Sequence, residues 1–202
     1  MEEFRSKIPV DGNIITECNH LLSYIPNFLG QMSDSYLDLS LELDSWRQDH
    51  ILLFGRQYKL PRLTLWYSAT GRSYTYSGIT MTGKPYPAFI SRISNHITRF
   101  SGLRFNSVLL NRYRTGADKI GWHSDKEKCL GETINIATIS LGSKRTLLVK
   151  KSGAKKFLKL ELEHGSLLLM KNPFQKTWLH CIPPRKHQSG ERISLTFRKI
   201  ES

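Results

Sequence analysis

The pattern of hydrophobic and polar positions changes near residue 104. Beyond it, apolar residues recur in short runs, several strictly alternating, which is typical of strands. The runs cover residues 105–113, 133–141, 144–150, 156–162, 167–170, 178–182 and 192–200. Lys151-Ser152-Gly153-Ala154-Lys155 lies between two of them and predicts a hairpin. Many short strands separated by turn residues predict a sandwich or jelly roll, with one or two helices over an outer face.

A helix is predicted over residues 85–100. Its apolar residues recur at helical spacing, a proline stands at its start, and Gly102 is suited to end it. The apolar positions are Phe89, Ile90, Ile93, Ile97 and Phe100.

The first forty residues give a mixed signal. Residues 25–29 predict a short extended segment. Ser33 and Asp34 are suitable caps for a helix over residues 36–43, whereas leucine at every second position from 37 to 43 is typical of a strand. We favour the helix.

Composition indicates one basic domain. The chain has 202 residues, 39% of them hydrophobic, which is enough for a substantial core. Neither a repeat nor a linker divides it. The formal charge of +13 creates a cationic field that attracts polyanions, so nucleic acid is the leading partner class. The alternative is a basic protein whose charge serves solubility alone.

The cysteines and the hydropathy pattern favour a soluble intracellular protein. Cys18, Cys129 and Cys181 are odd in number and widely spaced, so they indicate a reducing compartment rather than a disulfide framework. The N-terminal residues do not have the pattern of a signal peptide, and the apolar runs are too short to span a bilayer. We expect a monomer without a membrane partner, cytoplasmic in a prokaryote and nuclear in a eukaryote.

A candidate metal site begins at His123-Ser124-Asp125, with His180 as a third ligand candidate. Two histidines and one carboxylate, with other positions open, suit the non-haem Fe(II) oxygenases. An isolated histidine on a strand is more often a satisfied core or surface residue. Gly116 and Gly121 favour the metal site, because they put His123 at a strand or loop end, and a jelly roll can bring the strand of His180 face to face with it.

A cationic strand follows. In residues 192–198, Arg192, Ser194, Thr196 and Arg198 alternate with apolar residues, so their side chains share one side. Two arginines with hydroxyls between them suit a dicarboxylate. Asn111 and Tyr113 alternate likewise on another predicted strand and offer more donors. The alternative interpretation of residues 192–198 is a solvated face over an apolar core.

The combination of these motifs resembles the AlkB family of Fe(II)- and 2-oxoglutarate-dependent nucleic-acid dealkylases. The resemblance extends over residues 25–200 and rests on residues 111–114, 123–127, 164–170, 178–180 and 192–198. Residues 61–67 and 74–78 resemble the substrate lid of the branch that includes the human second and third AlkB homologues.

The resemblance implies a fold and a set of ligands. The fold is mainly β with flanking helices: a double-stranded β-helix over about residues 104–200, with an N-terminal helical and substrate-lid extension over about residues 1–103. The resemblance implies Fe(II) as the cofactor and 2-oxoglutarate as the co-substrate, together with O2. The residues implied to hold Fe(II) are His123, Asp125 and His180, and those implied to bind 2-oxoglutarate are Asn111, Tyr113, Arg192, Ser194, Thr196 and Arg198. Ser194 stands where many members have asparagine, which we expect to weaken co-substrate binding at most.

The resemblance also implies contacts with the substrate. Tyr74 matches the ring that stacks on an extruded base, and Glu127 the acid that faces its exocyclic amine. Phe54 lies in a segment like the finger that such enzymes insert into a duplex, although it is equally suited to end a buried strand. Further substrate-binding positions are Ser77, Gly78, Arg185 and Lys186.

The implied reaction is oxidative removal of methyl groups from bases such as 1-methyladenine and 3-methylcytosine. It is coupled to decarboxylation of 2-oxoglutarate and releases formaldehyde. We expect single- and double-stranded DNA as substrates. An RNA demethylase of the same chemistry remains an alternative, as does a non-catalytic nucleic-acid-binding protein. A protein or small-molecule hydroxylase fits the charge, Tyr74 and Glu127 less well.

Overall fold

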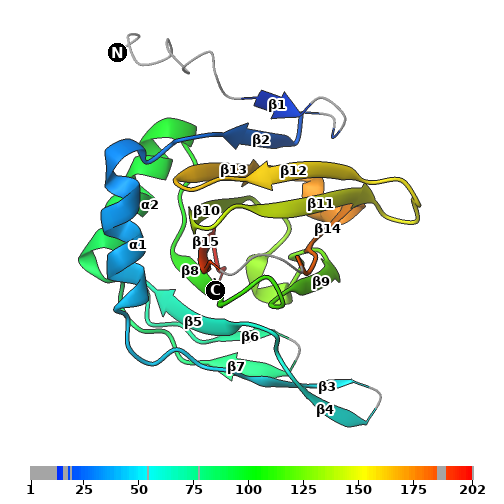
Figure 1. Cartoon of the computed structure of the whole chain (residues 1–202), viewed down its shortest axis with the longest axis horizontal. Helices are drawn as coiled ribbons and strands as arrows, with labels where there is room; N and C mark the ends of the chain where they lie inside the picture. The colour runs from blue at the N-terminus through cyan, green and yellow to red at the C-terminus, as the bar shows by residue number, and fades with distance from the viewer. Residues whose placement is uncertain are drawn as a thin grey trace.

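The computed structural model describes residues 13–15, 18, 20–53, 55–76, 78–185 and 190–201. Two antiparallel sheets face one another and form a jelly roll, and two helices cover the outer face of the larger sheet (Figure 1). The predicted fold class is confirmed.

The larger sheet has seven strands and draws on both halves of the chain. Strands from the first hundred residues lie at both of its edges, so the N-terminal segments complete the sheet. In spatial order the strands are β1 (Asn13–Ile15), β2 (Leu22–Ile25), β13 (Ser166–Met170), β10 (Ile136–Gly142), β15 (Arg192–Arg198), β8 (Ser107–Tyr113) and β5 (Leu63–Ser68).

The smaller sheet has four strands, and two hairpins extend beyond the sheets. The predicted hairpin around Gly153 is confirmed, because it joins β11 to β12 in antiparallel register. The smaller sheet contains β12 (Leu158–Leu162), β11 (Arg145–Lys151), β14 (Trp178–Ile182) and β9 (Ile120–His123), and the hairpins pair β3 (His50–Leu53) with β4 (Arg56–Lys59) and β6 (Tyr74–Tyr76) with β7 (Ile79–Met81).

Both predicted helices form. Helix α1 spans Ser33–Leu41, so the prediction of Ser33 and Asp34 as caps is wrong: both lie in the first turn, and the N-cap residue is Met32, without a side-chain cap hydrogen bond. Helix α2 spans Ala88–Ser101, where Gly102 in the left-handed conformation (φ +72°) ends it. The apolar face of α2 packs on the larger sheet, which explains its helical spacing. The prediction of an extended segment over residues 25–29 is wrong after Ile25: the chain turns there, with Asn27 at φ +49°. The short helices are η2 (Gly30–Met32), η3 (Lys128–Leu130) and α3 (Phe174–Thr177).

The alternating residues of strand β15 face two different parts of the molecule: the core under the helices and the space between the two sheets. Its apolar residues, Ile193, Leu195 and Phe197, are fully buried in the core under the helices. Its polar residues therefore point to the opposite side, between the two sheets, and every residue of the strand is buried. The interpretation of these arginines as a solvated face is wrong, because the smaller sheet covers them. No helix in the described part of the chain is long and apolar enough to cross a membrane.

A buried arginine ties the smaller sheet to two loops. Arg145 in β11 is 1% exposed, and its guanidinium donates hydrogen bonds to the carbonyls of Thr115 (3.3 Å), Asp118 (2.8 Å) and Pro183 (2.7 Å). The first two carbonyls precede β9 and the third follows β14, so Arg145 fixes the connections of both strands that carry the candidate histidines. It also lies 5.3 Å from the ring centroid of Tyr113.

We expect Arg145→Met to destabilise the fold by roughly 2–5 kcal/mol, because it leaves buried carbonyls without donors. Urea unfolding followed by circular dichroism measures the effect. Arg185→Met is the matched control: Arg185 is exposed, its contact to Glu161 is 3.5 Å long, and we expect a change within about 0.5 kcal/mol. Equal stabilities of the two variants would contradict the role of Arg145.

Candidate active site

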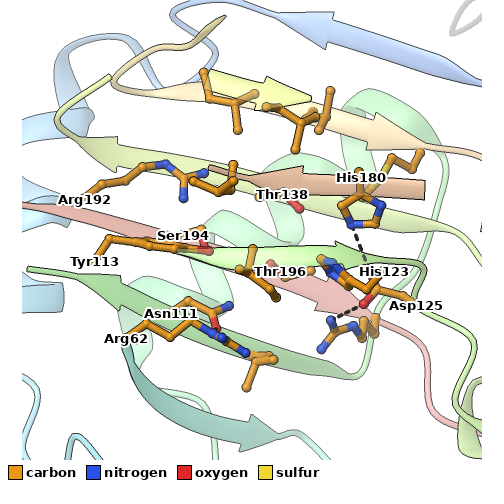
Figure 2. Close-up of a pocket in the computed structure, with 18 of the residues that line it drawn as sticks. Arg62, Asn111, Tyr113, His123, Asp125, Thr138, His180, Arg192, Ser194 and Thr196 are labelled. Atoms are coloured by element: carbon orange, nitrogen blue, oxygen red, sulfur yellow. Dashed lines mark hydrogen bonds and ion pairs between the residues drawn. The ribbon is translucent and has the colours of Figure 1, made fainter. Parts of the chain in front are cut away.

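A cavity of about 90 Å³ lies between the two sheets. The candidate metal ligands surround one end of it and Arg192 lies at the other, with Ser194 and Thr196 between them along β15 (Figure 2). The cavity therefore has a ligand set at one end and a buried cation at the other.

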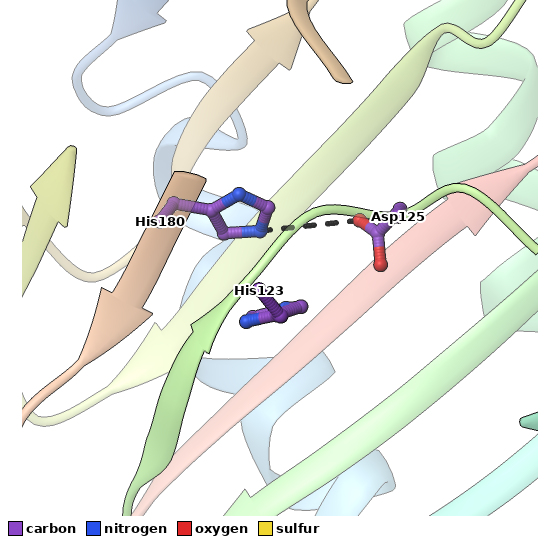
Figure 3. Close-up of side chains that lie close together, drawn as sticks. All are labelled: His123, Asp125 and His180. Atoms are coloured by element: carbon purple, nitrogen blue, oxygen red, sulfur yellow. Dashed lines mark ion pairs between the residues drawn. The ribbon is translucent and has the colours of Figure 1, made fainter. Parts of the chain in front are cut away.

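The three candidate metal ligands converge. One ligand atom from each of His123, Asp125 and His180 lies within 4.8 Å of the others, and His180 Nε2 is 4.0 Å from Asp125 Oδ2 (Figure 3). His123 ends β9, as its flanking glycines predict. The expectation that the two histidine strands meet face to face is wrong: β9 and β14 are neighbours in one sheet, and His123 and His180 are cross-strand partners.

An ion pair holds the carboxylate of this triad. Arg198 Nη2 donates to Asp125 Oδ1 at 2.7 Å, and both side chains are at most 5% exposed. The backbone amide of Asp125 donates to Gln175 Oε1 at 2.9 Å. Burial alone raises the pKa of Asp125, but the charge of Arg198 and its hydrogen bond to the carboxylate outweigh this effect and lower the pKa to about 2. The carboxylate is therefore ionised, as a metal ligand must be.

The imidazole of His180 is also in the state that metal binding requires. Burial and the neighbouring His123 lower the pKa of His180 to about 3, so its ring is neutral. His123 Nδ1 lies 2.8 Å from the carbonyl oxygen of Gly121. A carbonyl only accepts, so this bond puts the proton on Nδ1 and leaves the Nε2 lone pair for a metal. The donor set fits an Fe(II) ion with open positions.

The far end of the cavity fits an anion. Arg192 is 2% exposed and donates through Nη2 to Ser140 Oγ at 2.9 Å, while Nε and Nη1 are buried without a hydrogen-bond partner among the described residues. Burial lowers the pKa of Arg192. Tyr113 lies against it, with 5.1 Å between the guanidinium carbon and the ring centroid. A buried guanidinium with two unused donors suits a carboxylate.

Other predicted residues line the space between the two ends. Asn111 and Ser194 are cross-strand partners, and Thr196 follows on the same face. Arg198 has two further buried nitrogens, Nε and Nη1, without partners.

Several residues in the cavity or beside it were not predicted as site residues. Arg62 Nε donates to Asn111 Oδ1 at 2.8 Å, and Ser140 bonds Arg192. The partners of each pair are 49 and 52 residues apart in the sequence, so no local pattern reveals them. Thr138 also lines the cavity; the apolar character of its strand gave no signal for it.

Tyr74 and Glu127 line the cavity beside the metal ligands. Trp66, which the sequence analysis missed, stacks on Tyr74 with 4.3 Å between ring centroids. Burial raises the pKa of the Tyr74 hydroxyl, so the ring stays neutral. Within the part of the chain that the structure describes, Glu127 Oε2 is buried without a hydrogen-bond partner.

Two further predicted positions, Gly78 and Arg185, do not line the cavity. Gly78 is exposed in the turn between β6 and β7 (φ +79°), and Arg185 is exposed beside Glu161. Phe54, Ser77 and Lys186 lie outside the residues that the structure describes.

A jelly roll with a His-Asp-His triad at one end of its cavity and a buried, unpaired arginine at the other has the features of a metal-dependent oxygenase. The sequence profile described as the 2OG-Fe(II) oxygenase superfamily matches residues 21–198. The chain belongs to this superfamily and, within it, to the AlkB family.

Individual relatives agree with this assignment. The chain is 38% identical to human DNA oxidative demethylase ALKBH2 over 158 residues, which cover 74% of the chain and 60% of the relative. It is 37% identical to the Arabidopsis thaliana protein of the same name, covering 89% and 66%. It is 37% identical to human alpha-ketoglutarate-dependent dioxygenase alkB homolog 3, covering 77% and 57%. The chain thus spans about 60% of the length of the human relatives.

The fold also has a counterpart among solved structures. The structure of OsALKBH1 superimposes with a TM-score of 0.66 over 88% of this chain and 96% of that chain, at 17% identity. The shared architecture extends over nearly all of that protein.

We expect His180→Ala to abolish tight binding of one divalent transition ion, because the triad has no spare protein ligand. Titration calorimetry with Ni(II) gives a readout that does not depend on turnover. His50→Ala, at the edge of the β3–β4 hairpin, is the matched control and should bind as the unaltered protein does. Unchanged ion binding in His180→Ala would show that the triad is not the metal site.

Proposed function

We propose that this protein removes methyl groups oxidatively from N-alkylated bases in DNA, such as 1-methyladenine and 3-methylcytosine. The observation that carries the proposal is the cavity itself: an ionised carboxylate and two imidazoles converge at one end, and guanidinium nitrogens without a partner among the described residues lie at the other. Relatives that carry the name DNA oxidative demethylase support the choice of substrate.

His123, Asp125 and His180 would hold Fe(II). The bound ion, together with O2 and 2-oxoglutarate, supplies the oxidising chemistry. Arg198 holds Asp125 in one orientation, so one carboxylate oxygen is bound by the arginine and the other stays directed toward His180.

2-Oxoglutarate has a carboxylate at each end and fits the two poles of the cavity. Arg192 Nε and Nη1 would bind the distal carboxylate, with Tyr113 against the guanidinium. The donors between the poles would hold the end near the metal: Asn111, Ser194, Thr196 and Arg198. The smaller serine at 194 leaves Asn111 as the larger donor of that cross-strand pair.

Tyr74 and Glu127 would receive the damaged base. N1-methylation of adenine and N3-methylation of cytosine give cationic bases, and the unpartnered Glu127 Oε2 offers an acceptor to their exocyclic amine. Trp66 keeps the Tyr74 ring in place. The base must leave the duplex to reach this depth. Hydroxylation of the methyl group gives a hemiaminal, which releases formaldehyde and the repaired base.

The outer contacts complete the proposal. The β3–β4 hairpin extends away from the sheets (Figure 1), with Gly55 at φ +75° in its turn. We propose Phe54, which precedes Gly55 in the sequence, as the wedge that replaces an extruded base in duplex DNA. Ser77 and Gly78 would belong to the substrate lid. Arg185 and Lys186 would bind phosphates.

We propose a monomer whose chain forms a single dioxygenase domain acting on single- and double-stranded DNA. RNA is the alternative substrate of the same chemistry. The proposed location is intracellular: the cytoplasm of a prokaryote or the nucleus of a eukaryote.

Formaldehyde release tests the activity. We expect it from single- and double-stranded DNA containing 1-methyladenine or 3-methylcytosine, with a dependence on Fe(II), 2-oxoglutarate and O2. Methylated RNA oligonucleotides in the same assay separate the two nucleic acids. Turnover of 2-oxoglutarate without formaldehyde from any methylated oligonucleotide would contradict the proposal.

Arg192→Lys tests the co-substrate pole. Lysine keeps the charge but lacks the two-pronged donor geometry, so we expect the KM for 2-oxoglutarate to rise about tenfold or more while kcat changes less. Arg92→Lys, exposed on α2, is the matched control. A KM equal to that of the control would place the co-substrate elsewhere.

A further inference from the structure

Two exposed aromatic rings lie together on the outer face of the smaller sheet. Trp122 is 39% exposed and Phe157 is 46% exposed, and their ring centroids are 6.4 Å apart. Trp122 lies in β9 and Phe157 immediately precedes β12, at the two edges of the sheet. We call Trp122, Phe157, Lys150 and Lys159 the aromatic-lysine patch.

The alternation of the strands puts this patch outside the cavity. His123 faces the cavity, so Trp122, its neighbour in β9, lies on the opposite face of the sheet. Val149 in β11 is buried in the core between the sheets, so Lys150 likewise points outward. The patch thus lies behind the wall that carries the candidate metal ligands, and none of its members lines the cavity.

Each ring of the patch has a lysine over it. Lys150 Nζ is 4.6 Å from the Trp122 ring centroid, and Lys159 Nζ is 5.9 Å from that of Phe157. These cation–π contacts hold ammonium groups beside exposed ring surface. A ligand with flat bases and a negative backbone matches both features at once.

The charge around the aromatic-lysine patch indicates which kind of ligand can bind to it. Residues 144–160 contain seven lysines and arginines and no aspartate or glutamate. Two copies of such a surface would repel one another, and an apolar protein face would leave the charges unpaired. Arg145 is buried, but a polyanion gains from each of the other six, because lysines release counterions when they neutralise phosphates.

We propose that the aromatic-lysine patch is a stacking platform for single-stranded nucleic acid that flanks the nucleotide in the cavity. The proposal deepens the proposed function and rests on it for the identity of the strand. Bases of the flanking segment stack on Trp122 and Phe157, while Lys150 and Lys159 contact its phosphates.

The test is the affinity for an unmodified single-stranded DNA 20-mer, measured by fluorescence anisotropy without iron or 2-oxoglutarate. We expect Trp122→Leu and Phe157→Leu each to weaken binding about fivefold or more. Trp122→Phe keeps a stacking surface and should restore most of the affinity. Leu39→Ala, equally exposed at 39% but on α1, is the matched control and should bind normally.

The salt dependence of DNA binding distinguishes the contribution of the aromatic rings from that of the lysines. We expect the slope of log K against log salt to be unchanged in Trp122→Leu and to fall by about one in Lys150→Ala. Affinity equal to that of the control in both leucine variants would overturn the platform. So would a shift of oligomeric state in sedimentation as their main effect, because the patch would then be a protein interface.

The binding assay is independent of turnover. Loss of affinity in the leucine variants, together with no formaldehyde release by the unaltered protein, would remove the proposed function and leave the platform. Normal DNA affinity in the leucine variants, together with normal formaldehyde release by the unaltered protein, would remove the platform and leave the proposed function.

Discussion

The ion pair between Asp125 and Arg198 is the interaction on which the rest of the site depends. It spans the cavity, because Asp125 follows β9 of the smaller sheet and Arg198 belongs to β15 of the larger one. Both groups are almost fully buried, so neither charge can be left without the other; loss of one partner in such a pair costs about 3–5 kcal/mol. The same contact keeps the carboxylate ionised and orients it toward His180.

Strand β15 links the site to the hydrophobic core. Because strand side chains alternate, the residues that seal the core under α2 and the residues that define the cavity are consecutive in sequence. A register slip of one residue would exchange the two sets and destroy core and site together. Pairing with β8 and β10 fixes that register: Ser194 lies opposite both Asn111 and Ser140.

The sequence predicts those features that a local pattern of residues determines. Alternation predicts β15, helical spacing predicts α2, and the His-x-Asp spacing with a later histidine predicts the triad. The prediction failed where backbone geometry or distant pairing decides. Asn27 turns the chain where an extended segment was expected, and His123 and His180 are lateral rather than facing neighbours because β9 and β14 pair directly.

Long-range hydrogen bonds were also beyond prediction. Arg62 looked like part of a surface lid, yet its guanidinium is buried against Asn111. Arg145 lay within an ordinary basic strand, although its three carbonyl partners come from two separate loops. In each case the partner is set by tertiary packing, for which a single sequence carries no local signal.

The central claim is that the two poles of the cavity hold one molecule of 2-oxoglutarate. The most direct measurement is the Kd of 2-oxoglutarate in the presence and absence of a saturating redox-inactive divalent ion. Because one end of the ligand would bind at the metal and the other at Arg192, the account predicts binding at least about tenfold tighter with the ion present. Equal Kd values would contradict it, since the metal site and the arginine pole would then act on different ligands.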